Sequence, residues 1–191
     1  MPTRAWPEAR LALVGALRLA RGDRGGLACF DRSLDGFWRS FGAAVIGYPL
    51  YLLLLAMRVT VAEWERAGGF VIVTVETIAY VIGWVAFPLI MLTVTRLIGR
   101  AHRYFDFMVP YNWSQVPQSA LFVLVGLGTG SGASDAAPAQ AIEAVAAVAV
   151  LVYEWFIARV ALDTTAAAAA LIVVIDLILG VLVSNIAGSL Y

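Results

Sequence analysis

Long apolar segments separated by short charged ones make up most of this chain after residue 39. Five segments carry few or no charged side chains: residues 40–57, 69–95, 107–128, 139–161 and 164–190. A helix rises about 1.5 Å per residue, so about 20 residues cross a ~30 Å hydrocarbon core. The pattern therefore predicts an all-α, polytopic bundle of five transmembrane helices over residues 40–191.

Residues 1–39 have a different pattern, in which arginines and acidic residues interrupt short apolar runs. On a helical wheel the arginines of this region gather on one side and small apolar residues on the other: Arg10, Arg18 and Arg21 against Ala12, Ala16, Leu19 and Ala20. We therefore expect a basic, cytoplasmic N-terminal region with an amphipathic helix that lies on the membrane surface.

The composition excludes a soluble enzyme. Hydrophobic residues make up 62% of the chain and charged residues 14%, against about 45–50% and about 25% in soluble domains. All 13 basic residues are arginine, and the chain has one cysteine, Cys29, and one histidine, His102. Lysine chemistry, an internal disulfide and a site built from several cysteines or histidines are thus excluded. We expect no enzymatic activity, no cofactor, no metal site and no nucleic-acid partner.

The arginines predict the orientation. Eleven fall on one side of the five predicted spans, and two, Arg58 and Arg66, fall on the other. By the positive-inside rule the N-terminus is cytoplasmic, and five spans place Tyr191 on the periplasmic side. Three of the cytoplasmic arginines lie between the second and third spans: Arg96, Arg100 and Arg103. Each contributes about 1 kcal/mol to binding anionic lipid headgroups when it lies near the surface.

Polar side chains within the predicted spans form two layers. Counted along the helices, Glu76 and Asp176 both lie about 20 Å from the cytoplasmic face, within a turn of Gln118 and Ser119. The second layer lies nearer the cytoplasm and contains Asn112, Gln115 and Glu154.

The two deeper acids, Glu76 and Asp176, are expected to have no arginine at their own level. A carboxylate at the centre of a bilayer costs about 2.5–3.5 kcal/mol. These acids must therefore be protonated, hydrogen-bonded or neutralised by a bound cation. They form either a proton- or cation-coupled site or a structural network that joins helices.

The third predicted span has two prolines, Pro110 and Pro117. Each removes a backbone donor, so the sequence predicts a kink or an unwound stretch between them. Asn112, Gln115 and Ser119 fall on one stripe of this helix. Transporters use broken, polar helices of this kind to reach a substrate, so this is the first place to expect a ligand.

Two helix faces are expected to point inward. Gly180, Ser184 and Gly188 recur every four residues, a spacing typical of close helix–helix packing, either within one protomer or between protomers. On the second span one face carries four residues that should turn away from lipid because of the acid among them: Glu76, Tyr80, Gly83 and Phe87.

Three segments carry a resemblance: GFWRSF at residues 36–41, YFDFMVPYNW at 104–113 and YEWFIAR at 153–159. They resemble segments of a family of uncharacterised five-span inner-membrane proteins of alphaproteobacteria, which implies a bacterial inner-membrane location and no particular activity. The layout of a cytoplasmic N-terminal region before five helices is also similar in topology to the Yip1 family of membrane-organising proteins.

The sequence favours one function and leaves a second open. The favoured one is a non-enzymatic scaffold that organises the membrane, with the lipid bilayer and a second copy or another membrane protein as partners. The alternative is a small proton- or cation-coupled transporter or channel subunit that uses Glu76, Asp176 and the third span. A water-filled cavity that reaches both acids favours transport, whereas a dry, closed bundle in which those acids are hydrogen-bonded internally favours the scaffold.

Overall fold

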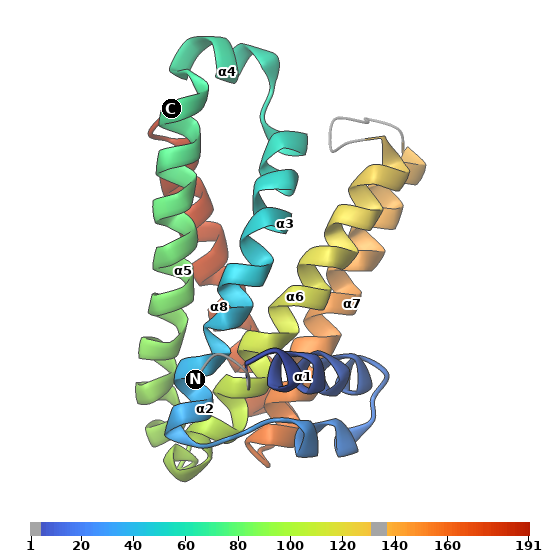
Figure 1. Ribbon diagram of the computed structural model, residues 1–191, viewed down its shortest axis with the longest axis vertical. Coiled ribbons are helices and arrows are strands. Elements are labelled where there is room, and N and C mark those ends of the chain that lie inside the picture. Colours follow the sequence, from blue (N-terminus) through green and yellow to red (C-terminus); the bar gives the residue numbers. More distant parts are fainter. Residues whose placement is uncertain (1–4, 131–136) are drawn as a thin grey trace.

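The computed structural model describes residues 5–130 and 137–191, and these residues form helices and loops without a strand (Figure 1). Five long helices run along the molecule: α3 (Gly42–Arg58), α5 (Gly69–Leu97), α6 (Tyr104–Thr129), α7 (Ala137–Ala161) and α8 (Ala166–Gly188). The shorter elements are α1 (Ala5–Ala20), η2 (Arg24–Cys29), α2 (Leu34–Ser40), α4 (Val61–Ala67) and η3 (Ala101–Arg103). Each predicted apolar segment is thus mostly helical.

Within residues 5–130 and 137–191, four helical segments are long and apolar enough to cross a membrane: Leu34–Arg58, which combines α2 and α3, and α5, α7 and α8. The helix α6 is not among them, although it has 26 residues. Polar residues occupy its centre, and every residue from Phe107 to Ser114 is buried. It packs against α1, α2, α3 and α7, so protein rather than lipid covers the polar part of this helix.

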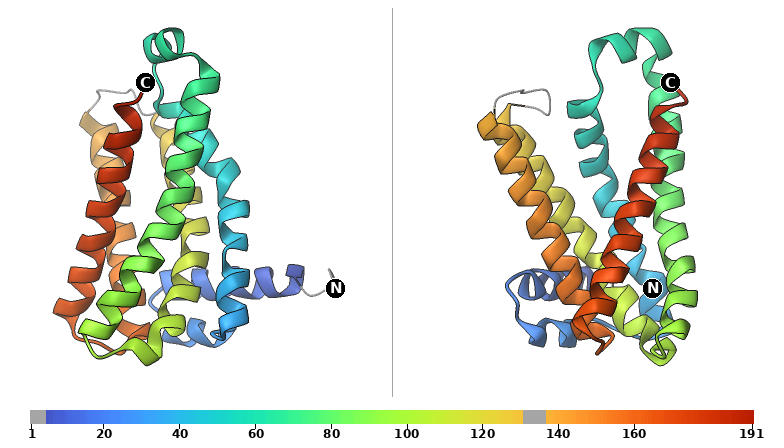
Figure 2. Two further views of the ribbon diagram at one scale, coloured as in Figure 1. Left: turned by 90° about the vertical axis from the view of Figure 1, so that its left-hand side faces the viewer. Right: turned by 180° about the vertical axis from the view of Figure 1, so that it is seen from behind.

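The five long helices form a ring. Going round the ring, α3 packs against α6, α6 against α7, α7 against α8, and α8 against α5 (Figure 2). Side chains close the ring between α5 and α3, where the Tyr80 hydroxyl donates to the Ala44 carbonyl at 2.7 Å and the Tyr48 and Thr77 hydroxyls are 2.6 Å apart. The ring encloses the space in which the candidate site lies.

The helix α6 is continuous through Pro110 and Pro117. Of the two expected outcomes, a kink or an unwound stretch, the unwound stretch is therefore wrong. A proline removes one backbone hydrogen bond, and the contacts of α6 with α3 and α7 hold the remaining turns in place.

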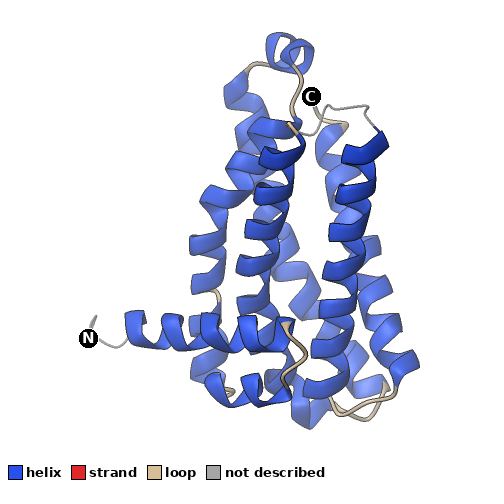
Figure 3. Ribbon diagram, turned by 90° about the vertical axis from the view of Figure 1, so that its right-hand side faces the viewer, coloured by secondary structure: helices blue, strands red, loops and turns tan. Residues whose placement is uncertain are grey.

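The two ends of the bundle differ. At one end, α1 lies across the long helices, and α2, η2 and η3 lie near it, whereas α4 and Tyr191 lie at the opposite end (Figures 1 and 3). The face of α1 that packs on the bundle contains Ala12, Ala16 and Leu19, and its outward face exposes Leu11, Val14 and Leu17. Three of the four residues on the apolar arc of the helical wheel are thus covered by protein, and the fourth, Ala20, is exposed.

A capping box stabilises α4, the short helix between α3 and α5. The Thr60 hydroxyl accepts a hydrogen bond from the Glu63 N–H, and the Glu63 carboxylate accepts one from the Thr60 N–H. Hydrogen bonds from the backbone and the side chain of Thr60 hold the pKa of Glu63 below its usual value. This cap starts α4 directly after α3 ends.

The close approach of α1 and η2 predicts that Gly15→Ala destabilises the protein. An added Cβ at Gly15 would lie 2.7 Å from the Cys29 Cβ and 2.9 Å from the Gly26 carbonyl oxygen. Overpacking of this kind costs about 1–3 kcal/mol. Thermal unfolding in detergent, followed by tryptophan fluorescence, should therefore show a lower midpoint for this variant.

The matched control is Gly128→Ala in α6, because a Cβ at Gly128 meets no atom within 4 Å. That change is expected to be neutral or to stabilise the helix by up to about 1 kcal/mol. Equal midpoints for the two variants would show that α1 and η2 are not packed as described.

Candidate functional site

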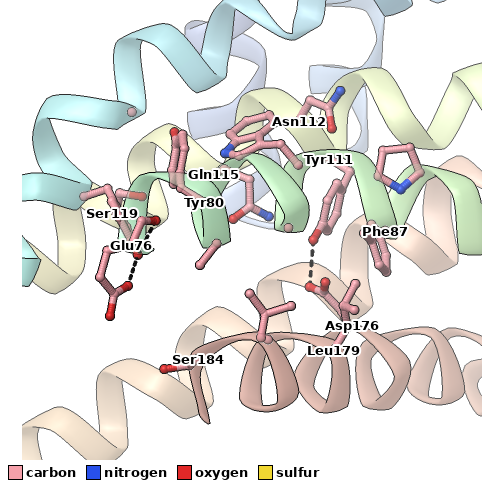
Figure 4. A pocket seen from close by; sticks show the side chains of 18 of the residues that line it. Glu76, Tyr80, Phe87, Tyr111, Asn112, Gln115, Ser119, Asp176, Leu179 and Ser184 are labelled. Atoms are coloured by element: carbon pink, nitrogen blue, oxygen red, sulfur yellow. Dashed lines mark hydrogen bonds between the residues drawn. The ribbon is translucent and has the colours of Figure 1, made fainter. Parts of the chain in front are cut away.

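A cavity of about 370 Å³ lies inside the ring, between α3, α5, α6 and α8 (Figure 4). Its volume is within the range of about 300–1,000 Å³ that is usual for small-molecule sites. It is partly open to the outside, and its lining is mostly apolar with polar groups at several points. The predicted stripe of Asn112, Gln115 and Ser119 forms the α6 side of the lining.

The inward face of α5 is confirmed. Glu76, Tyr80, Gly83 and Phe87 all line the cavity, together with Trp84. These positions follow the helical repeat, so one face of α5 supplies both a carboxylate and a wall of aromatic rings. The opposite face of this helix exposes apolar residues, as expected for contact with lipid.

Glu76 is the centre of a polar cluster at one end of the cavity. Its side chain is 2% exposed, and its carboxylate forms a salt bridge with Arg58, whose Nη2 donates a hydrogen bond at 2.5 Å. The hydroxyls of Tyr51 and Tyr191 also donate to its carboxylate, the latter at 2.6 Å. Arg58 Nη1 donates to Ser184 Oγ at 3.1 Å. The cluster therefore ties α3, α5 and α8 together.

The prediction that Glu76 has no basic partner and shares a layer with Asp176 is wrong. Glu76 lies two turns from the start of α5 at Gly69, close to the end of the bundle that contains α4. Arg58, at the end of α3, reaches it along the neighbouring helix. Figure 4 shows Glu76 and Asp176 at opposite ends of the cavity, with Gln115 between them.

Asp176 lies in a different environment. Its carboxylate accepts a hydrogen bond from the Tyr111 hydroxyl at 2.7 Å (Figure 4). The Phe87 and Tyr111 rings lie next to each other with centroids 4.4 Å apart. Within the part of the chain that the structure describes, no arginine forms a salt bridge with Asp176. A second acid, Glu154 of α7, lies close enough to interact with it electrostatically.

The amides of α6 have separate roles. Asn112 donates to the Ser40 hydroxyl at 2.8 Å and so holds α6 against α2. Gln115 points into the cavity (Figure 4). Its Nε2 is buried and has no hydrogen-bond partner, and among the described residues no other buried side-chain nitrogen or oxygen lacks one. Such an atom is rare in a folded protein and marks a place where water or a ligand can bind.

The other two predicted polar residues, Gln118 and Glu154, do not line the cavity. Both are buried. Gln118 donates to Ser114 Oγ at 3.1 Å, and Glu154 lies close to the amides of Gln115 and Gln118 on the α7 side of α6. The structure therefore divides the predicted site into a cavity-lining part and a buried part behind it.

The stripe of Gly180, Ser184 and Gly188 was expected to pack within one protomer or between protomers, and the structure shows no close packing at its two glycines within the protomer. A Cβ at either glycine would meet no atom within 4 Å. Gly180 and Ser184 line the cavity instead. The spacing does place small residues on one face, but they leave room for the cavity and do not bring two helix backbones together.

The arginines expected to bind lipid headgroups lie at the end of the bundle that contains α1. Arg100 donates to the Asp163 carbonyl at 3.0 Å, and Arg103 lies 3.7 Å from the Asp163 carboxylate. Arg96 is exposed. Two of the three therefore hold the turn between α7 and α8, which leaves Arg96 as the most accessible to lipid.

Sequence reasoning missed Tyr51 and Arg58 as cavity residues. They are seven residues apart and so lie on one face of α3. That shared face is the pattern from which the two could have been predicted. Arg58 stands at the end of the apolar segment, however, where an arginine indicates only the orientation of the helix in the membrane. Tyr191 gave no signal, because its partner lies 115 residues earlier.

The fold and the site thus describe a helical protein with apolar helices long enough to cross a membrane and a polar cavity between them. Comparison of the chain with protein-family models, with curated proteins and with solved structures gave no match. Among the described residues, no three His, Cys, Asp or Glu side chains gather closely enough to hold a metal ion.

Proposed function

We propose that this protein is a small transporter or channel subunit of the bacterial inner membrane, coupled to protons or cations. The observation that carries the proposal is the cavity lined by both Glu76 and Asp176. A polar cavity between apolar helices gives a small solute a place to bind within the bilayer, and intramembrane acids are typical of ion and proton pathways.

In the proposed topology α6 also crosses the membrane, as the third of five spans. It runs beside α3 and α7, has 26 residues and is long enough to cross a ~30 Å core. With five spans the arginine-rich end of the bundle is cytoplasmic and the end with α4 and Tyr191 is periplasmic. The helix α1 then lies along the cytoplasmic surface of the membrane. Its outward face carries Arg10 beside Leu11, Val14 and Leu17, and Arg21 follows its end, so the arginines extend to the lipid headgroups while the apolar side chains face lipid.

The two ends of the cavity have different roles in this proposal. The Glu76 and Arg58 pair is neutral overall and joins three helices near the periplasmic end, so it acts as a gate. Asp176 is the binding group. It faces Tyr111 from α6 and Glu154 from α7, so a proton or a cation must balance its charge when it ionises. Coupling follows because the proton and the solute compete for one carboxylate.

The scaffold hypothesis rests on the small-residue stripe of Gly180, Ser184 and Gly188 and on the basic N-terminal region. Within the protomer, no atom lies within 4 Å of a Cβ at either glycine of this stripe. Contact between protomers through this stripe stays a prediction.

A substituted cysteine tests whether the cavity is open to water. In a Cys29→Ser background, Ser119→Cys places one thiol on the cavity lining. We expect a small water-soluble thiosulfonate reagent to label it in intact membrane vesicles. The control is Val148→Cys on the outward face of α7, where the side chain is 58% exposed and is expected to face lipid. Equal, slow labelling of both thiols would indicate a dry bundle and contradict the proposal.

Asp176→Asn tests the coupling. In proteoliposomes with an imposed pH gradient, we expect the wild-type protein to carry a pH-dependent flux of protons or cations. The variant should abolish this flux, because an amide cannot exchange a proton. An unchanged flux would remove Asp176 from the mechanism.

A further inference from the structure

We propose that the cavity binds a small organic cation, with an ammonium group at Asp176 and a hydrogen-bond acceptor at Gln115. This inference rests on the proposed function and names the class of solute. Three features of the cavity carry it: an uncompensated carboxylate, a wall of aromatic rings and an amide donor without a partner.

The charge on the cavity lining is unbalanced. Glu76 is paired with Arg58 at 2.5 Å, so this end of the cavity is neutral. Asp176 has one neutral donor, the Tyr111 hydroxyl, and no arginine partner among the described residues. An ionised carboxylate in such a site is stabilised by a ligand with a positive charge, whereas an anionic ligand would be repelled.

The walls of the cavity favour an organic cation over a small metal ion. Five aromatic side chains line it: Tyr51, Tyr80, Trp84, Phe87 and Tyr111. The Phe87 and Tyr111 rings lie beside Asp176, and the Tyr80 ring lies between those of Tyr51 and Trp84, with centroids 4.7 and 6.0 Å away. Aromatic faces attract ammonium groups, whereas hard metal ions need several oxygen ligands, which Asp176 alone does not supply.

Gln115 gives the ligand a second contact point. Its side chain is part of the cavity lining between Glu76 and Asp176 (Figure 4). Its buried Nε2 lies near the Glu154 carboxylate but forms no hydrogen bond of normal geometry among the described residues, so a rotation of the amide would turn it to a ligand without breaking one. A hydroxyl or carbonyl oxygen near the ammonium group would satisfy it. The preferred ligand is therefore a compact ammonium compound that also carries an oxygen.

Choline and 3,3-dimethyl-1-butanol test the charge requirement, because the two probes have nearly the same shape and differ in the positive charge. Isothermal titration of the full chain in detergent should show choline binding on the order of tenfold or more tighter than the neutral probe. Asp176→Asn should remove this preference, and Asp176→Glu should restore part of it. Equal binding of the two probes, or no binding of choline, would overturn the inference.

Two control variants separate charge from folding. Asp35→Asn makes the same chemical change at an exposed position of α2 and should leave choline affinity unchanged. Glu76→Gln should change it by less than Asp176→Asn, because Glu76 already has a cationic partner. A larger loss with Glu76→Gln would overturn the assignment to Asp176. Unfolding midpoints measured on the same samples exclude loss of binding through misfolding.

The outcomes also separate this inference from the proposed function. If Ser119→Cys is labelled and the flux depends on Asp176, but choline and its neutral analogue bind equally, the inference fails and the transport proposal stands. If the cavity thiol is not labelled, both the transport proposal and this inference fail.

Discussion

Arg58→Ala is expected to destabilise the protein by about 2–3 kcal/mol, and adding Glu76→Gln is expected to recover part of that loss. The single change leaves an acid that is 2% exposed without its cation. Removing one partner of a fully buried ion pair costs about 3–5 kcal/mol, and we expect less because the Arg58 side chain is 51% exposed. Replacing both charges removes the uncompensated carboxylate and leaves the hydroxyls of Tyr51 and Tyr191 to bond the amide.

The measurement is a double-mutant cycle on thermal unfolding in detergent. Arg66→Ala is the control for loss of an arginine, since Arg66 donates to the Tyr191 carbonyl and forms no salt bridge with Glu76. Additive effects of Arg58→Ala and Glu76→Gln would show that the two side chains do not interact, and would remove the proposed gate.

Gly180→Leu is expected to abolish solute binding and flux while the protein remains folded. Gly180 lines the cavity, and a Cβ there meets no atom within 4 Å, so a leucine fills empty space without a clash with the backbone. Replacing a glycine in a helix also removes a penalty of about 0.5–1 kcal/mol. The variant should therefore unfold at the same or a higher temperature than the wild-type protein.

Val181→Leu is the matched control, because Val181 is the next residue of α8 and is 50% exposed on its outward face. It should retain binding and flux. Size-exclusion chromatography with light scattering adds a separate readout. If Gly180→Leu changes the oligomeric state, the stripe on α8 is an interface between protomers and not a cavity wall.

The helices could be predicted from the sequence because apolar segments with few charges have one stable form in a membrane. The inward face of α5 followed in the same way, since Glu76 could not face lipid. The depth of Glu76 could not be predicted, because it depends on how far α5 extends past the neighbouring helix ends. Arg58 reaches Glu76 through a long side chain on a different helix, and spacing along the chain does not show that.

The stripe on α8 shows a second limit. Small residues every four positions allow two helices to approach, but they also allow a space to remain between them. The choice depends on the tilt of α8 against α5 and α7, which the local sequence does not determine. For the same reason the prolines of α6 predicted a break that its neighbours prevent.

The buried centre of α6 has a consequence for how the protein is made. A segment with Asn112, Gln115 and Gln118 in its middle is a weak signal for insertion into the bilayer by itself, because each amide must leave water without a partner. In the folded protein Asn112 bonds Ser40 of α2 and Gln118 bonds Ser114. In the proposed topology, α6 therefore enters the membrane only when the earlier helices are already there to receive it, and a chain without α2 and α3 should insert α6 poorly.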